Sequence, residues 1–111
     1  MSPMARRTRP QPRLPPQLET AVGAFGSRED LAILAFLGSV ETALSSEIAD
    51  VTQMAAMTVH RHLVDLEDLA LIRVDTPQGA RRGRTVRYSL DRVQTAAMIE
   101  SLRVALLGDD G

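Results

Sequence analysis

The chain of 111 residues contains no cysteine and no lysine, and only 3% of its residues are aromatic. The absence of cysteine excludes disulfides, thiolate metal ligands and a cysteine nucleophile. Because aromatic side chains are so scarce, the core has to be built from Leu, Val, Ile, Ala and Met. Such a core favours a helix-rich fold over a β-sandwich or a barrel. The length suits one domain with tails.

Long apolar runs and catalytic motifs are absent as well. No run approaches the roughly 18 apolar residues that a membrane span needs, and the N-terminus has no signal-peptide hydrophobic region. We therefore expect a soluble, cytoplasmic protein without membrane contact. There is no glycine-rich phosphate loop and no serine in a nucleophile-elbow motif. We accordingly expect that the protein is not an enzyme and has no cofactor.

The net charge of −1 hides a segregation of charge along the chain. Residues 1–18 and residues 71–92 each carry a charge of +4, whereas residues 19–70 carry −7. All thirteen basic residues are arginines. Arginine suits two-pronged contacts to phosphate, although a GC-rich genome would give the same preference. Because local fields steer association more than totals do, the two basic segments are compatible with an acidic partner.

The composition divides the chain into three parts. Residues 1–16 contain five of the six prolines and four arginines, which predicts a disordered or extended arm. Residues 17–107 are expected to form the folded domain, and residues 108–111 a flexible tail.

The first half of the domain predicts two helices and a link. Residues 17–25 form the first, short helix, and Ser27 is a suitable N-cap for a second helix over residues 28–37. This second helix is apolar nearly all round, which indicates burial on more than one side. Residues 40–44 are expected to be extended and able to pair with a later hairpin as a third strand.

Two further helices follow in close succession. Residues 45–51 form the first of them, with Ser45 or Ser46 as its expected cap. Residues 55–70 form the second, longer helix. Its apolar residues recur at spacings of four, three and three, which places them on one face: Val59, Leu63, Leu66 and Leu69.

A basic hairpin comes directly after this helix pair. Residues 71–74 and 85–90 predict two strands, and the loop over residues 76–84 holds two glycines and three arginines. Two helices joined by a tight turn and followed by a basic hairpin make a winged helix-turn-helix, a mainly α (α+β) fold with a two- or three-stranded β wing. Such a unit places its second helix in the major groove of double-stranded DNA.

A final helix begins after Asp91, its expected N-cap, with Gln94 completing a capping box. Apolar residues cover most of its circumference, which would leave a large exposed patch on a monomer. We expect the protein to form a homodimer through this helix together with the two N-terminal helices. The alternative is that the helix packs only on its own domain. The residues expected at the dimer interface are Val93, Ala97, Leu102 and Leu106.

The fold assigns expected roles in DNA binding. The N-terminal half of the helix over residues 55–70 should contact base edges, with the candidates Ala56, Met57, Thr58, His60 and Arg61. Phosphate contacts are expected from the arginines of the wing: Arg81, Arg82, Arg84 and Arg87. The arm over residues 1–16 is either an unstructured terminus or a segment that reaches DNA.

The segments 47–50 and 58–67, with the hairpin from Arg73 through Gly83 and Arg84 to the Arg87–Leu90 end, resemble the ArsR family of dimeric winged-helix repressors. The resemblance covers residues 27–107 in element order and 44–90 in residue pattern. It implies a homodimer that binds a palindromic operator and regulates transcription.

The sequence departs from this family's usual pattern in the turn and at the helix start. Gln53 and Ala55 stand where a glycine and a Ser or Thr cap are common, and Ala56 and Met57 replace polar side chains that contact bases. Metal-sensing members use cysteine pairs in the helix that corresponds to residues 55–70, or sets of Asp, His and Glu in the last helix. Cysteine is absent and residues 91–111 contain no His, so we expect no metal site.

These observations predict a homodimeric, sequence-specific DNA-binding regulator that acts as a repressor, with an effector ligand unspecified. The alternative is a winged-helix interaction or assembly module, as in plasmid or phage maintenance, that binds a protein without sequence-specific DNA binding. The negative segment and the apolar start of the helix over residues 55–70 favour that alternative.

Overall fold

The computed structural model of the chain describes residues 12–108, so most of the predicted arm and of the predicted tail lies outside the described residues. The described part contains helices and one small antiparallel sheet. In chain order the elements are α1 (Pro16–Phe25), α2 (Arg28–Gly38), α3 (Ser45–Thr52), α4 (Ala56–Asp68), β1 (Ile72–Val74), the 3-10 turn η2 (Gln78–Ala80), β2 (Tyr88–Leu90) and α5 (Arg92–Leu107). This order confirms the predicted winged helix-turn-helix fold.

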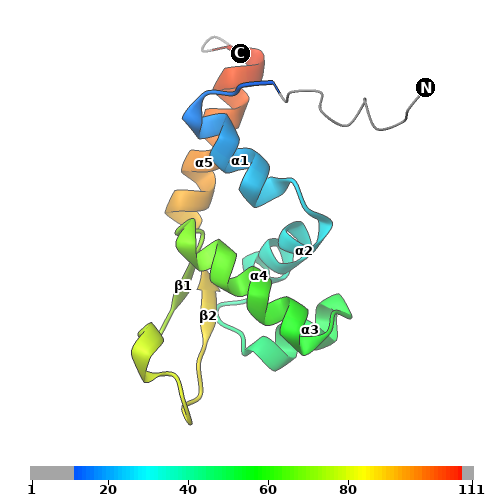
Figure 1. The fold of residues 1–111 in the computed structure, drawn as a ribbon, viewed down its shortest axis with the longest axis vertical. Coiled ribbons are helices and arrows are strands. Elements are labelled where there is room, and N and C mark those ends of the chain that lie inside the picture. The colour runs from blue at the N-terminus through cyan, green and yellow to red at the C-terminus, as the bar shows by residue number, and fades with distance from the viewer. Residues whose placement is uncertain (1–11, 109–111) are drawn as a thin grey trace, which may run out of the picture.

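The elements form two groups around one apolar core. Helices α1 and α5 pack side by side at one end of the molecule, while α3 and the hairpin lie toward the opposite end (Figure 1). The largest fully buried side chains come from α2, α3, α4 and the residue before β1: Ile33, Leu37, Ile48, Val59, Leu63, Leu66 and Leu71. None of the described helices is long and apolar enough to cross a membrane.

Local capping explains where α2 and α5 begin. The Ser27 hydroxyl accepts a hydrogen bond from the Asp30 backbone N–H at 2.9 Å, and the Asp91 carboxylate accepts one from the Gln94 N–H at 2.8 Å. Both caps satisfy an otherwise unpaired donor of the first helical turn and confirm the two predicted N-caps. The expected capping box of α5 is wrong, because the Asp91 backbone N–H donates to the Leu71 carbonyl rather than to the Gln94 side chain. The Asp91 carboxylate also accepts a hydrogen bond from Arg73. The Gln94 N–H and, to a smaller extent, Arg73 lower the pKa of the Asp91 carboxyl group.

The expected serine cap of α3 is wrong. Ser45 and Ser46 both lie inside the helix, and Leu44 occupies the capping position. Instead, the Glu47 carboxylate accepts a hydrogen bond from the Leu44 backbone N–H at 2.8 Å. This contact is one half of a capping box, and it shifts the helix start one residue earlier than a serine cap would.

The turn between α3 and α4 contains Gln53 in a left-handed conformation, with φ of 60°. Helix α4 then begins without a side-chain cap at Ala55. Neither neighbour supplies one, because Thr52 donates back to the Ile48 carbonyl and Gln53 to that of Asp50. The geometry of the turn is therefore set by the backbone rather than by a capping side chain.

Helix α4 ends at Asp68, two residues earlier than predicted, and the reason is a left-handed Ala70 with φ of 62°. The Ala70 N–H donates to the Glu67 carbonyl and the Leu71 N–H to the Leu66 carbonyl. These two bonds make a Schellman motif. The motif turns the chain directly from α4 into β1.

The hairpin is shorter than the sequence predicted. Strands β1 and β2 pair antiparallel, with Ile72 opposite Leu90 and Val74 opposite Tyr88. Strand β2 begins at Tyr88, because the carboxylate of Asp75 accepts the Arg87 backbone N–H at 3.0 Å in place of a strand carbonyl. The expected third strand consists of one bridge between Ala43 and Tyr88.

Candidate nucleic-acid interface

Helix α4 has two distinct faces. Val59, Leu63 and Leu66 are fully buried in the core, as the sequence predicted. With 3.6 residues per turn, Met57 and Arg61 point away from these residues. Met57 is 82% exposed and Arg61 is exposed as well. The first two turns of α4 thus present an outward surface that the core does not occupy.

The other base-contact candidates flank this surface. Ala56 and His60 are exposed, whereas Thr58 is half-buried at its edge. The side chains of Met57, His60 and Arg61 make no hydrogen bond or ion pair within the described part of the chain. Further along α4, two exposed carboxylates follow at Asp65 and Asp68. Because carboxylates repel phosphate, only the first two turns of α4 present a surface that an acidic partner could approach.

His62 lies on the inner side of α4, away from Met57 and Arg61, and links α4 to α2. Its Nδ1 lies 2.8 Å from Oδ1 of Asp30 in the first turn of α2, and both side chains are largely shielded from solvent. A largely buried polar pair of this kind fixes the two helices relative to each other. His62 therefore packs α4 against α2, whereas His60 is exposed.

The wing consists of β1, β2 and the loop over residues 75–87. Arg82, Arg84 and Arg87 are exposed along it, and Gly83 has the positive φ of 71° that lets the tip reverse. At its base, the Arg87 N–H lowers the pKa of the Asp75 carboxyl group. The wing therefore carries three guanidinium groups in solvent on a loop that hydrogen bonds close at its base.

Arg81 differs from the other wing arginines. Its Nη1 and Nη2 donate to the two oxygens of Glu67 at 3.2 and 2.8 Å, and its Nε donates to the Thr76 carbonyl at 2.8 Å. The Glu67 contact raises the pKa of Arg81. The phosphate contact expected of Arg81 stays a prediction, and these intramolecular bonds compete with it.

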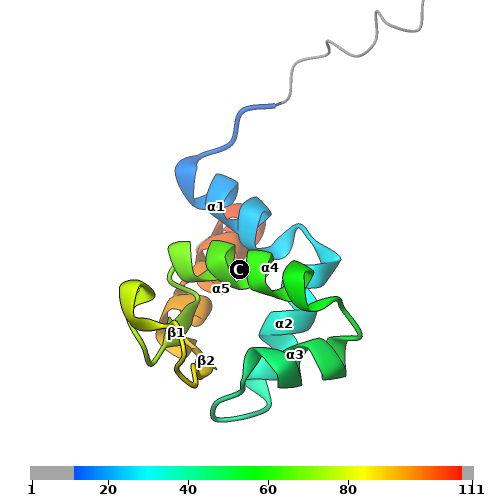
Figure 2. The same ribbon diagram turned by 60° about the horizontal axis from the view of Figure 1, so that its bottom comes forward.

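The wing and the helix-turn-helix lie at the same end of the molecule. Seen from that end, the hairpin lies on one side of α4 and α3 on the other (Figure 2). Helices α1 and α5 extend away from this end. A duplex that contacts α4 therefore has the wing arginines beside it and leaves the α1–α5 pair free for other contacts.

An apolar groove runs between α1 and α5, with a volume of about 370 Å³. Leu18, Val22 and Phe25 line it from α1, and Leu102 and Leu106 from α5. Leu106 is 69% exposed in the single chain. Two residues predicted for the dimer interface thus lie together in this groove.

Val93 and Ala97 do not share that groove. They precede Leu102 by nine and five residues, which places Val93 about 180° from Leu102 around the helix. Val93 is 78% exposed, on a different side of α5 from the groove. The structure therefore separates the four predicted interface residues into two sets.

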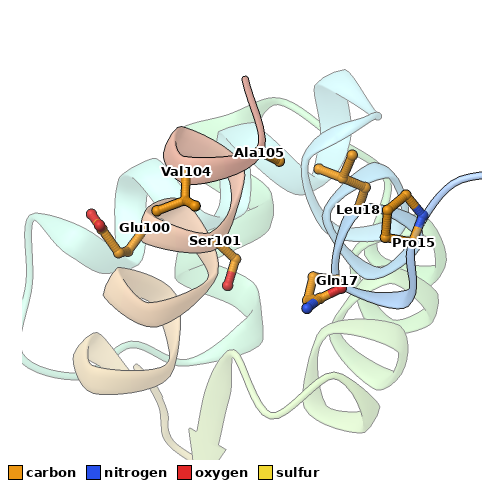
Figure 3. Close-up of a pocket in the computed structure, with 7 residues that line it drawn as sticks. All are labelled: Pro15, Gln17, Leu18, Glu100, Ser101, Val104 and Ala105. Carbon is orange, nitrogen blue, oxygen red and sulfur yellow. The ribbon is translucent and has the colours of Figure 1, made fainter. Parts of the chain in front are cut away.

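A second hollow lies between the start of α1 and the end of α5. Pro15, Gln17 and Leu18 line one side and Ser101, Val104 and Ala105 the other, around a volume of about 370 Å³ (Figure 3). Its carboxylate, Glu100, is bound to Arg103 at 2.7 Å, which lowers the pKa of that carboxyl group. This hollow and the groove make the α1–α5 pair an uneven, mostly apolar surface.

No three His, Asp or Glu side chains of the described residues gather in a way that could hold a metal ion. Two pairs that shape the site were missed by the sequence interpretation. Asp30 with His62 and Glu67 with Arg81 are 32 and 14 residues apart. Local patterns give no signal for such pairs, because only the packed fold brings them together.

The fold of this chain is similar to those of several solved transcriptional regulators. No protein-family model and no curated protein matches the sequence. Among solved structures, an ArsR-like transcriptional regulator from Rhodococcus sp. RHA1 matches with a TM-score of 0.66 and 20% identity, over 86% of this chain and 85% of its own. HlyU from Vibrio cholerae matches with a TM-score of 0.61 and 22% identity, over 79% and 89%.

A third structure is the homodimeric winged helix-turn-helix DNA-binding domain of a possible ArsR-family transcriptional regulator from Mycobacterium bovis. Its TM-score is 0.56 at 19% identity, over 79% of this chain and 81% of that one. The resemblance drawn from the sequence is thereby confirmed for the fold. The chain has the winged helix-turn-helix fold of the ArsR-family regulators.

Proposed function

We propose that this protein is a homodimeric, sequence-specific DNA-binding regulator that represses transcription. The observation that carries the proposal is the outward surface of α4. Met57, His60 and Arg61 are exposed there and have no polar partner among residues 12–108, at the helix position that winged-helix proteins insert into the major groove. The shared fold with transcriptional regulators supports the same conclusion.

In this proposal the contacts divide by chemistry. Arg61 and His60 donate hydrogen bonds to base edges, Thr58 does so from the edge of the surface, and Ala56 and Met57 contact thymine methyl groups. Arg82, Arg84 and Arg87 contact phosphates, since flexible guanidinium groups on a wing meet the backbone rather than the bases.

The dimer follows from the apolar α1–α5 surface. A monomer would leave the groove with Leu106 and the apolar end of α5 in water. A second copy covers this surface, and its two-fold symmetry implies an operator with two half-sites about 34–36 Å apart or a multiple of that. The Mycobacterium bovis domain with this fold is homodimeric.

The first expected result is a strong salt dependence. We expect the logarithm of duplex affinity to fall linearly with the logarithm of salt concentration, with a slope of several units, because each neutralised phosphate releases counterions. Fluorescence anisotropy at several salt concentrations gives the slope. A flat response, or no binding at low salt, contradicts the proposal and favours the interaction module, in which Met57 contacts an apolar protein surface.

The second expected result separates α4 from the wing. Arg84→Ala should weaken binding to specific and random duplexes alike and reduce the salt slope by about 1. Arg61→Ala should instead cost about 1–3 kcal/mol at one position of the specific site. Both variants replace an exposed arginine, so each serves as the other's control for lost charge.

The measurement uses an operator selected from a random duplex pool and a scrambled duplex of the same composition. Equal losses on both duplexes for Arg61→Ala would place Arg61 on a phosphate. Thr58 and His60 would then be the remaining polar side chains for base contact.

A further inference from the structure

Arg81 is the most shielded arginine of the wing that the structure describes. Its side chain is 18% exposed and that of Glu67, its partner, is 24% exposed, while Arg82, Arg84 and Arg87 are all exposed. A guanidinium group that binds a carboxylate through two N–H groups makes a strong, directional contact. The contact joins the wing loop to the last turn of α4.

The Arg81 side chain also makes a hydrogen bond within the wing loop. The Arg81 Nε donates to the carbonyl of Thr76 at 2.8 Å, and Thr76 is itself buried. The Thr76 hydroxyl in turn donates to the Asp75 carboxylate, which accepts the Arg87 N–H. One guanidinium group thus connects both sides of the wing loop to the helix behind it.

This geometry leaves Arg81 little capacity for DNA. Three nitrogen atoms of the guanidinium group already donate to protein oxygens. Two N–H groups remain, one on each Nη, but only 18% of the side chain is exposed, and a phosphate that reached them would lie beside the Glu67 carboxylate, which repels it. No such competition exists at Arg82 and Arg84, whose guanidinium groups have no partner within the described residues.

We propose that Arg81 is a positioning residue: through Glu67 it holds the wing at a fixed place relative to α4. Arg82 and Arg84 then stay at the distance from the base-contacting turns that a duplex requires. The effect of Arg81 on DNA affinity rests on the proposed function, whereas the Arg81–Glu67 ion pair is present in the protein without DNA. Pre-organising the wing lowers the ordering cost of binding.

The first experiment tests the link without DNA, by limited trypsin digestion of the full chain. Glu67→Ala removes the partner and leaves every arginine in place, and Asp68→Ala is the matched control, since Asp68 is an exposed carboxylate on the same turn. We expect cleavage after Arg82 and Arg84 to be about tenfold faster in Glu67→Ala than in Asp68→Ala. Mass spectrometry of the fragments measures it. Equal rates overturn the proposal.

A charge swap provides a second, independent readout. The double variant Glu67→Arg with Arg81→Glu restores an ion pair of opposite polarity, so its wing should be protected to within about threefold of the unmodified protein. Protection that is lost in Arg81→Glu alone and restored in the double variant supports the link. A double variant as sensitive as the single one contradicts it.

The DNA measurement discriminates positioning from phosphate contact by the salt slope of Arg81→Ala. If Arg81 bound phosphate in the unmodified protein, Arg81→Ala would reduce the slope by about 1, as expected for Arg84→Ala. Positioning predicts instead an affinity about tenfold weaker with an unchanged slope. A slope reduced by about 1 overturns the proposal.

The two proposals can fail separately. An unmodified protein that binds no duplex overturns the proposed function, whereas the digestion result still decides whether Arg81 holds the wing. Normal duplex binding with equal digestion of Glu67→Ala and Asp68→Ala overturns the positioning role alone.

Discussion

Replacing Leu106 with Glu is expected to dissociate the dimer and to weaken operator binding by about 100-fold or more, because two linked half-sites give an avidity that one half-site lacks. Leu106 is 69% exposed in the single chain and lines the groove beside Val22 and Leu102. A carboxylate buried there against a second copy would be desolvated without a partner. Light scattering measures the oligomeric state, and anisotropy measures the affinity.

Replacing Leu106 rather than Leu102 separates loss of the dimer from unfolding of the monomer. Leu102 packs against the core of its own chain, so a charge at that position would also unfold the monomer. Leu106→Glu should keep the circular dichroism spectrum of the unmodified protein. Val93→Glu is the matched variant, since Val93 is 78% exposed on another side of α5. A dimer that survives Leu106→Glu but is lost in Val93→Glu would place the interface on that other side.

Replacing Leu63 with Ala is expected to lower the free energy of unfolding by about 3 kcal/mol, the usual cost of removing a buried leucine side chain and leaving a cavity. Leu63 is 1% exposed, in the middle of the inner face of α4. Because about 1 kcal/mol corresponds to roughly 4–8 °C in a domain of this size, the loss should also be plain in thermal melting. Urea denaturation gives the free energy.

The control for Leu63→Ala is Met57→Ala on the opposite face of the same helix. Met57 is 82% exposed, so the unfolding free energy should change by no more than about 0.5 kcal/mol. In the proposed function the same substitution weakens duplex binding through the lost methyl contact. If Met57→Ala destabilised the fold as much as Leu63→Ala, the assignment of the two faces of α4 would be wrong.

The order of the elements could be predicted from the sequence because it depends on neighbouring residues. Ser27 and Asp91 cap the helices that the apolar pattern outlines, and the inner face of α4 follows from the spacing of Val59, Leu63 and Leu66. Helix and strand boundaries differed from the prediction at the end of α4 and the start of β2. Strand β2 begins later than predicted because the Asp75 carboxylate, rather than a strand carbonyl, accepts the Arg87 N–H. Strand propensities do not include such a side-chain contact.

The candidate site was only partly predictable for the same reason. The sequence identified the exposed residues of α4 and the arginine-rich wing, but all four arginines at 81–87 look alike in a charge pattern. The fold distinguishes them, because Arg81 binds Glu67 and is shielded, whereas Arg82, Arg84 and Arg87 are exposed. The split between Val93 and Leu102 could have been found from the sequence, since nine residues make two and a half helical turns.

The two faces of α4 also bear on how such a regulator can diverge. Substitutions at Met57, His60 and Arg61 break no hydrogen bond or ion pair within the described part of the chain, so they carry little penalty for folding. Gene duplicates could therefore acquire new operators by drifting at these positions while the inner face stays constant. If the proposed function holds, preference for a DNA sequence and thermodynamic stability are encoded on opposite sides of a single helix, and mutation can change the first without lowering the second.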